Sequence, residues 1–215
     1  MSTRDLILGR IDAAIKSVAV APDAINAAYN ALPRNYVRKG MLDHRAVVEL
    51  LIDRLKDYDT VVECCQPGDL LKVIAAHIEA SGRKKLVAPE GLPAAWMVQG
   101  SEWVVDHQLS HDEVNACEGV VTAAFCGIAD SGTIVLHHSP EEGRRVLTLL
   151  PDWHLCILKM SQVVETYPEY VARCSEPPRL ATNFSGPSAT ADIEMTRIKG
   201  VHGPRFLEVI LVEDL

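Results

Sequence analysis

Hydroxyl-bearing and glycine residues gather in three short segments of this chain. These segments read GIADSGTIVL over residues 127–136, SGPSATADIE over 185–194 and GVHGPR over 200–205. Small residues let backbone N–H groups approach a ligand oxygen, and the titratable side chains among them can transfer a proton. The three segments therefore predict a site for a small polar ligand.

The first segment combines an acid with two hydroxyls around a glycine. Asp130 can accept a proton or a hydroxyl hydrogen bond, and it is the first candidate catalytic residue. Ser131, Gly132 and Thr133 are candidates for ligand binding. The same composition is also typical of an ordinary tight turn, so the segment by itself supports both interpretations.

The second segment places hydroxyls ahead of a short helix that we expect to begin near Ala189. Free N–H groups at such a helix start favour an anion, although Ser188 could instead serve only as the N-cap. Asp192 and Glu194 lie two residues apart and would not share a helix face, which argues against a paired-carboxylate mechanism. The candidate ligand-binding residues of this segment are Ser185, Gly186, Ser188 and Thr190.

The third segment sets a histidine among glycines and close to an arginine. The ring of His202 titrates near neutral pH and is the second candidate catalytic residue. Gly203 and Arg205 are candidates for ligand binding, because an arginine can hold a carboxylate or phosphate through two parallel hydrogen bonds. The alternative for His202 is a loop histidine whose ring is satisfied by backbone groups.

Other arrangements that carry chemistry are weak or missing. His107 and His111 have the spacing of a helical metal pair, but Ser110-His111-Asp112 is typical of a helix start, so we predict no metal site. Arg144 and Arg145 could meet an anion, but we expect a solvated pair. The chain has no G-x-S-x-G, Walker or G-x-G-x-x-G motif. Its six cysteines form no C-x-x-C and no cluster-binding spacing, which favours reduced, mostly buried thiols; they lie at positions 64, 65, 117, 126, 156 and 174.

Two helices are expected ahead of these segments. Apolar residues at 7, 11, 14, 15 and 18 follow a helical period, with Ser2 or Thr3 as the cap and Ala21-Pro22 as the end of the helix. A loop leads to the second helix, which begins after Asp43 and has Val47, Leu50, Leu51 and Leu55 on one side.

Residues 60–88 read as strand, helix and strand. Thr60 to Cys64 is rich in β-branched residues, Leu70 to Ile78 follow a helical period, and Gly82 lies where a left-handed C-terminal cap is needed. Leu86 to Ala88 forms the second strand. The length suits a right-handed crossover between two parallel strands.

The rest of the chain is richer in strands. We expect a helix over Gln162 to Arg173, and further strands at 102–105, 119–121, 124–129, 133–137, 155–158 and 206–212. The predicted fold class is α/β, with an open, mixed or mostly parallel sheet flanked by helices over residues 59–215. Residues 1–58 would form an N-terminal helical extension packed on this single domain.

Composition excludes several classes of protein. The chain has 215 residues, a net charge of −8 and 48% hydrophobic residues, the balance of a globular domain with one sizeable core. The acidic charge argues against a general nucleic-acid binder. No run is long enough to span a membrane and no signal-peptide pattern begins the chain, so we expect a cytoplasmic protein without a transmembrane segment.

Taken together, the C-terminal segments resemble the LUD-domain family, and within it the lactate-utilisation protein C branch. The resemblance rests on GIADSGTIVL (127–136), GRRVLTLLPDWHLCIL (143–158), SGPSATADIEMTRIKGVHGPR (185–205) and the closing hydrophobic strand. Ser131 stands where the family often has threonine, which keeps the hydroxyl. The resemblance implies a fold like that of glucosamine-phosphate isomerase, ribose-phosphate isomerase and the CoA transferases, in which ligands bind beyond the carboxyl ends of the strands.

The resemblance also implies a role in a bacterial system that oxidises L-lactate to pyruvate. The iron–sulfur clusters of that system belong to partner subunits, so we expect no cofactor on this chain. As a subunit of such an oxidoreductase complex, the chain would bind a small carboxylate or phosphorylated ligand. The alternatives are a non-catalytic assembly or regulatory module, and a binding protein for a small anionic metabolite.

Overall fold

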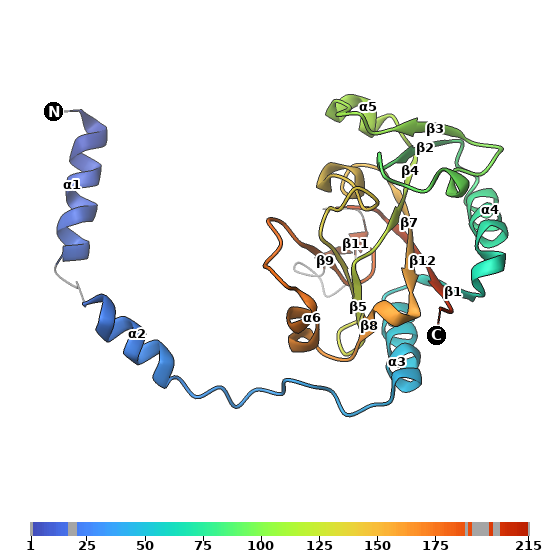
Figure 1. Cartoon of the computed structure of the whole chain (residues 1–215). Coiled ribbons are helices and arrows are strands. Elements are labelled where there is room, and N and C mark those ends of the chain that lie inside the picture. The colour runs from blue at the N-terminus through green and yellow to red at the C-terminus, as the bar shows by residue number, and fades with distance from the viewer. Residues whose placement is uncertain (1, 17–20, 188, 191–197, 200–202, 215) are drawn as a thin grey trace. The chain divides into compact units, whose positions relative to one another are not determined.

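The computed structural model describes residues 2–16, 21–187, 189–190, 198–199 and 203–214. The chain divides into two units, Met1–Val37 and Arg38–Leu215 (Figure 1). The division falls before the helix at residue 44, whereas the expected boundary at residue 58 follows that helix.

The first unit contains two helices, α1 (Thr3–Lys16) and α2 (Pro22–Ala31). Helix α1 forms where the apolar period predicted it, and the Ser2 hydroxyl accepts a hydrogen bond from the Asp5 backbone N–H at 3.2 Å. The prediction for Pro22 was wrong in part. This proline does not lead into a loop but begins α2, because a fixed φ and a missing N–H are tolerated in the first turn of a helix.

A six-stranded parallel sheet forms the centre of the second unit. Its order is β1-β12-β7-β4-β2-β3, and every neighbouring pair is parallel. The strands are β1 (Val61–Cys65), β2 (Lys85–Ala88), β3 (Glu102–Val105), β4 (Gly119–Ala123), β7 (Trp153–Lys159) and β12 (Phe206–Val212). The expected crossover from β1 to β2 through α4 (Leu70–Ser81) is present, with three other strands between the two. Gly82 ends α4 in the predicted left-handed conformation, with φ of +69°.

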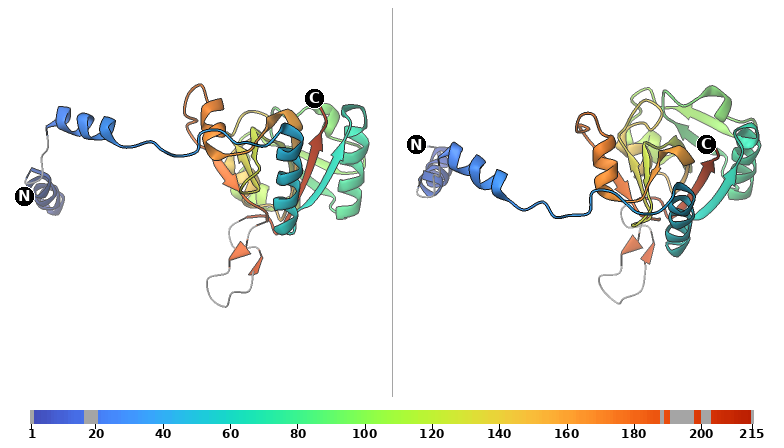
Figure 2. Two further views of the ribbon diagram at one scale, coloured as in Figure 1. Left: turned by 90° about the horizontal axis from the view of Figure 1, so that it is seen from below. Right: turned by 60° about the horizontal axis from the view of Figure 1, so that its bottom comes forward.

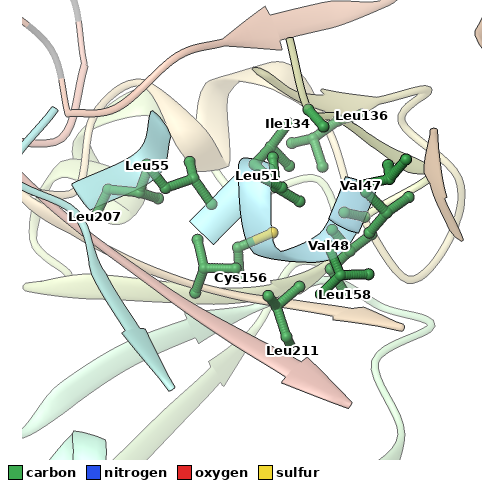
Figure 3. Close-up of a cluster of buried hydrophobic side chains, with 14 residues drawn as sticks. Val47, Val48, Leu51, Leu55, Ile134, Leu136, Cys156, Leu158, Leu207 and Leu211 are labelled. Carbon is green, nitrogen blue, oxygen red and sulfur yellow. The ribbon is translucent and has the colours of Figure 1, made fainter. Parts of the chain in front are cut away.

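Alternating residues of β12 separate two hydrophobic layers. Leu207, Val209 and Leu211 pack with Leu51 and Leu55 of α3 (His44–Asp57), as the close-up in Figure 3 shows for four of them. Ile210 and Val212 pack with α4 on the other face of the sheet. The two helices accordingly lie on opposite sides of β12 (Figure 2). Helix α3 begins at its predicted cap, since Asp43 accepts a hydrogen bond from the backbone N–H of Ala46 at 2.9 Å.

A second, mixed sheet of four strands packs on the same face of the main sheet as α3. Its order is β8-β5-β6-β9, and its strands are β5 (Cys126–Ile128), β6 (Thr133–Leu136), β8 (Val163–Val164) and β9 (Thr182–Phe184). Strands β5 and β6 form the predicted antiparallel hairpin around Asp130 to Gly132. Ile134 and Leu136 of β6 join the core beneath α3. The mixed pairing that we allowed for a single sheet is thus confined to this smaller one.

Two predicted helices differ in the structure. The helix expected from Gln162 begins only at Tyr167, because residues 160–162 form a single 3₁₀ turn, η4 (Met160–Gln162), and β8 follows it. Thr166 caps the observed helix α6 (Tyr167–Arg173). Instead of a helix start at Ala189, strand β10 (Ala189–Thr190) pairs with β11 (Ile198–Lys199), so the described residues 189–190 and 198–199 are extended and not helical.

Four further short helical elements connect the described strands. They are η1 (Pro67–Asp69), η2 (Ala94–Trp96), α5 (His111–Asn115) and η3 (Arg145–Thr148). Ser110 caps α5 through a capping box, as the sequence around His111 predicted. The turn η3 leads into β7 and supplies one wall of the pocket described next.

Candidate functional site

A pocket of about 280 Å³ lies against the amino-terminal ends of β7 and β12, on the face of the main sheet that the small sheet covers. Residues 182–187 form one wall and η3 another, while Gly203 and Pro204 precede β12. Its lining residues are Arg145, Thr148, Leu149, His154, Thr182, Asn183, Phe184, Ser185, Gly186, Pro187, Gly203, Pro204 and Leu207. The volume is close to the lower end of the roughly 300–1,000 Å³ that is usual for small-molecule sites.

The pocket contains a buried histidine from β7. His154 is 2% exposed, and its Nε2 is hydrogen-bonded to Oγ1 of Thr122 at 2.8 Å. The ring of Phe184 lies 5.4 Å away, centroid to centroid. Burial lowers the pKa of His154 to about 3, because the apolar surroundings penalise the charged ring. The ring is therefore neutral at physiological pH, and Nδ1 is the nitrogen left to contact a ligand.

Three hydroxyls link the first two segments singled out in the sequence. Oγ1 of Thr133 is hydrogen-bonded to Oγ of Ser131 at 2.8 Å and to Oγ of Ser185 at 2.7 Å. Ser131 is exposed, Thr133 is buried and Ser185 lines the pocket. This hydroxyl chain brings the β5–β6 turn behind the pocket wall, where Thr133 supports Ser185 from a position outside the lining residues.

Glycines let both turns pack against the end of α3. Gly132 has φ of +60°, and a Cβ at this position would come within 2.7 Å of Cβ of Arg54. Gly186 has φ of +77°, and its Cβ would overlap the side chain of Tyr58, the residue that ends α3. A larger residue at either position would be strained and would also push the turn away from α3. Helix α3 thereby fixes both ends of the hydroxyl chain.

His138 supports the start of the wall formed by residues 182–187. Its Nε2 is hydrogen-bonded to Oγ1 of Thr182 and its Nδ1 to the carbonyl oxygen of Gly143, both at 2.8 Å. His138 adopts φ of +60°, an unusual conformation for a residue with a side chain. The contacts hold Thr182 against the loop that leads to η3.

The arginines of this region have different environments. Arg144 pairs with the buried carboxylate of Asp106 at 2.6 and 2.7 Å. Arg205 pairs with Asp152 at 2.5 and 2.9 Å, and this pair holds the pKa of Asp152 below its usual range. Arg145 lines the pocket, and among the described residues no carboxylate pairs with it. Of the two adjacent arginines expected to be solvated, one is thus an internal ion-pair partner and the other faces the pocket.

The structure places some of the predicted site residues at the pocket and others away from it. Ser185, Gly186 and Gly203 line the pocket, and Ser131, Gly132 and Thr133 lie behind it. Asp130 is exposed and is not among the lining residues; its backbone N–H donates to the carbonyl oxygen of Glu165 at 3.0 Å. Arg205 follows the lining residues Gly203 and Pro204, but its guanidinium binds Asp152. His202 and Ser188 lie outside the described residues, as does the side chain of Thr190.

Two titratable residues of the lining, Arg145 and His154, were not among the sequence candidates. Arg145 was interpreted as solvated, and His154 was given no role, because it precedes the apolar run 155–158 that was predicted as a strand. The signal that could have found His154 is its place in WHLCIL, where a histidine interrupts an otherwise apolar run. A polar residue in a strand covered on both faces needs a partner, which here is Thr122.

Metal and thiol chemistry have little support in the described part of the chain. No three histidine, cysteine, aspartate or glutamate side chains come together there as a metal site would require. All six cysteines are free thiols, and burial raises the pKa of Cys126 and of Cys156 to about 12. Thiols of such pKa are poor nucleophiles at neutral pH.

Comparison with known proteins identifies the family. A model of the LUD domain matches residues 48–212 of the chain. The chain belongs to the LUD-domain family. A Deinococcus radiodurans protein named lactate utilization protein C is 36% identical over 175 residues, which cover 80% of this chain and 82% of that protein. A protein of the same name from an Exiguobacterium species is 27% identical over 201 residues, covering 87% and 86%.

A solved structure supports the fold of this LUD-domain chain. The crystal structure of a DUF162 family protein from Deinococcus radiodurans matches with a TM-score of 0.67 and 31% identity, covering 80% of this chain and 99% of that one. The likeness to sugar-phosphate isomerases and CoA transferases stays a prediction. The pocket of the LUD domain differs from what that likeness implied, because His154 and Leu207 are each the second residue of their strand, at the amino-terminal ends. The turns at Gly132 and Gly186 lie there because they adjoin strands of the smaller sheet, whereas Gly203 precedes β12 of the main sheet.

The lengths of the apolar runs predicted no transmembrane segment. Among the described residues of the LUD-domain chain, no helix has the length and apolar character needed to cross a bilayer.

Proposed function

We propose that this LUD-domain chain is a component of a bacterial system that oxidises L-lactate to pyruvate, acting with iron–sulfur partner subunits. The observation that carries the proposal is its homology to proteins named lactate utilization protein C, at 36% identity over 80% of the chain in one case. The family match over residues 48–212 shows that the similarity covers both sheets.

The pocket offers a place for the small organic acid of this reaction. Converting lactate to pyruvate removes two electrons and two protons, so the reaction needs an electron acceptor as well as a binding site for the acid. We assign the electron transfer to iron–sulfur clusters on the partner subunits, since the six cysteines of this chain have no cluster spacing. Arg145 and the hydroxyl of Ser185 are the groups suited to holding the acid.

A second role is favoured by a specific observation. The hydroxyls of Ser131, Thr133 and Ser185 are hydrogen-bonded to one another, and Arg205 is already paired with Asp152. Side chains satisfied in this way stabilise loops without a ligand. The chain could therefore be a non-catalytic assembly or regulatory module that binds the partner subunits while the chemistry occurs on them.

Growth and reconstitution test the proposed role. Deleting the gene should abolish growth on L-lactate as the sole carbon source while growth on pyruvate continues, and a plasmid copy should restore growth. Unchanged growth on lactate would overturn the proposal. Reconstitution of lactate oxidation from purified components, with this chain omitted, then asks whether it is needed for turnover. If Arg145→Gln supports full turnover where omission of the chain abolishes it, the assembly role is favoured over substrate binding.

A further inference from the structure

The pocket has an unusual charge for this acidic chain. Arg145 is the one charged side chain among its described lining residues, although the whole chain carries a net charge of −8. The remaining polar side chains of the lining are neutral: Thr148, His154, Thr182, Asn183 and Ser185. A pocket with one fixed positive charge and several neutral hydrogen-bonding groups best complements a ligand with one negative charge.

The comparison with neighbouring arginines strengthens this interpretation. Arg144 and Arg205 each meet a carboxylate of this chain with two hydrogen bonds, the geometry in which guanidinium and carboxylate match. Arg145 has no such partner among the described residues and borders a cavity instead. A carboxylate brought by a ligand would give Arg145 the interaction that its neighbours already have.

The buried histidine keeps the charge at one. His154 is 98% buried, and Thr122 occupies one of its two ring nitrogens. Its low pKa keeps the ring neutral, so it can form a hydrogen bond with an oxygen of the ligand without adding a second positive charge. Leu149, Phe184 and Leu207 supply apolar surface for a short carbon chain.

We propose that the pocket is a binding site for a small monocarboxylate, with Arg145 holding the carboxylate and Ser185 and His154 contacting the rest of the molecule. This deepens the proposed function, since L-lactate and pyruvate belong to this class. A dicarboxylate or a phosphate dianion would bring a charge that the described lining does not balance. The site therefore selects its ligand by charge as well as by size.

Calorimetric titration of the full chain tests the site directly. The probes are L-lactate, pyruvate, L-malate and inorganic phosphate, each at pH 7.5. We expect a monocarboxylate to bind and Arg145→Gln to weaken its binding about 10- to 150-fold, as for loss of a hydrogen-bonded charge. Arg145→Lys should recover part of the affinity, because it restores the charge without the two parallel hydrogen bonds. Arg45→Gln is the matched control, because Arg45 is an exposed arginine on α3 and is not among the lining residues.

The pH profile separates carboxylate from phosphate recognition. Monocarboxylate affinity should be flat between about pH 5.5 and 8, because the buried ring of His154, with its pKa lowered to about 3, stays neutral throughout this range. Phosphate changes charge there, so tighter binding of phosphate with a pH dependence would overturn the proposal. It would also be overturned if neither monocarboxylate bound, if malate bound more tightly, or if Arg145→Gln kept wild-type affinity. The gene deletion tests the proposed function separately. If the deletion strain fails to grow on lactate, the proposed function stands even where the titrations overturn the monocarboxylate site.

Discussion

Replacing Thr133 by valine tests whether the hydroxyl chain joins the two turns. Valine has nearly the shape of threonine, so the substitution removes Oγ1 and its hydrogen bonds to Ser131 and Ser185, and most of the packing stays. Thr133 is 7% exposed, and its hydroxyl is the central one of the three, bonded to those of Ser131 and Ser185. We therefore expect its loss to weaken the contact between β6 and the loop after β9.

The size of the effect follows from the exposure of the partners. A hydrogen bond contributes about 0.5–1.5 kcal/mol net, and a buried group left without a partner costs about 1–3 kcal/mol. Ser131 is exposed and Ser185 borders the pocket, so both can bond to water after the substitution. The free energy of unfolding should accordingly fall by about 1–3 kcal/mol, because two hydrogen bonds are lost and no buried group is left without a partner.

Urea unfolding of a double-mutant cycle measures this contribution. Tryptophan fluorescence reports on the larger unit alone, because all three tryptophans, at 96, 103 and 153, lie in it. In the cycle of Thr133→Val and Ser185→Ala we expect a coupling energy of about 0.5–1.5 kcal/mol. Thr133→Val combined with Ser81→Ala, a change on α4, should be additive. Additivity within about 0.3 kcal/mol in the first cycle would refute the hydroxyl chain as a stabilising link.

Two further predictions concern stability elsewhere in the larger unit. His77 on α4 is hydrogen-bonded to Glu208 and Glu63, and these bonds raise the pKa of its ring. The stabilisation from these bonds should be complete below about pH 6.5 and lost as pH rises through the folded-state pKa. In urea unfolding, the free energy of unfolding of wild type should therefore exceed that of His77→Gln by more at pH 6 than at pH 9. An equal difference at both pH values would contradict this. Gly186→Ala should lower the free energy of unfolding by about 1–3 kcal/mol, because φ is +77° and a Cβ has no room, whereas Gly68→Ala in open space should have little effect. A wild-type unfolding midpoint for Gly186→Ala would show that the turn can move away from α3.

Local signals predicted the elements whose causes are local. The hairpin of β5 and β6 follows from Asp130-Ser131-Gly132 between two apolar runs, and α4 ends at Gly82 as expected. Pro22 was misread because a proline is compatible both with the end of one helix and with the first turn of the next. The start of α6 was predicted too early for a related reason: the residues before it are compatible with a helix, but 160–162 form η4 and 163–164 form β8, which pairs with β5.

The candidate site depended on contacts that no local pattern contains. The sequence indicated Thr133 and Ser185 as members of one site, and they do meet, but it could not show that Thr133 lies behind the pocket wall. The role of Arg145 depends on Asp106 pairing with the neighbouring Arg144, and that of His154 depends on the hydroxyl of Thr122. Both are consequences of tertiary packing, which brings together residues that are distant in the chain.

The position of β12 has a consequence for the biosynthesis of the protein. Strand β1 has β12 as its one partner in the main sheet, with Val61 opposite Glu208, and β12 also separates β1 from β7. A nascent chain cannot complete this sheet until residues 206–212 have left the ribosome. Until then β1 and one side of β7 expose unpaired backbone groups, which makes the emerging polypeptide a substrate for chaperones and prone to aggregation. Premature termination a few codons before residue 206 would remove the strand that both β1 and β7 need.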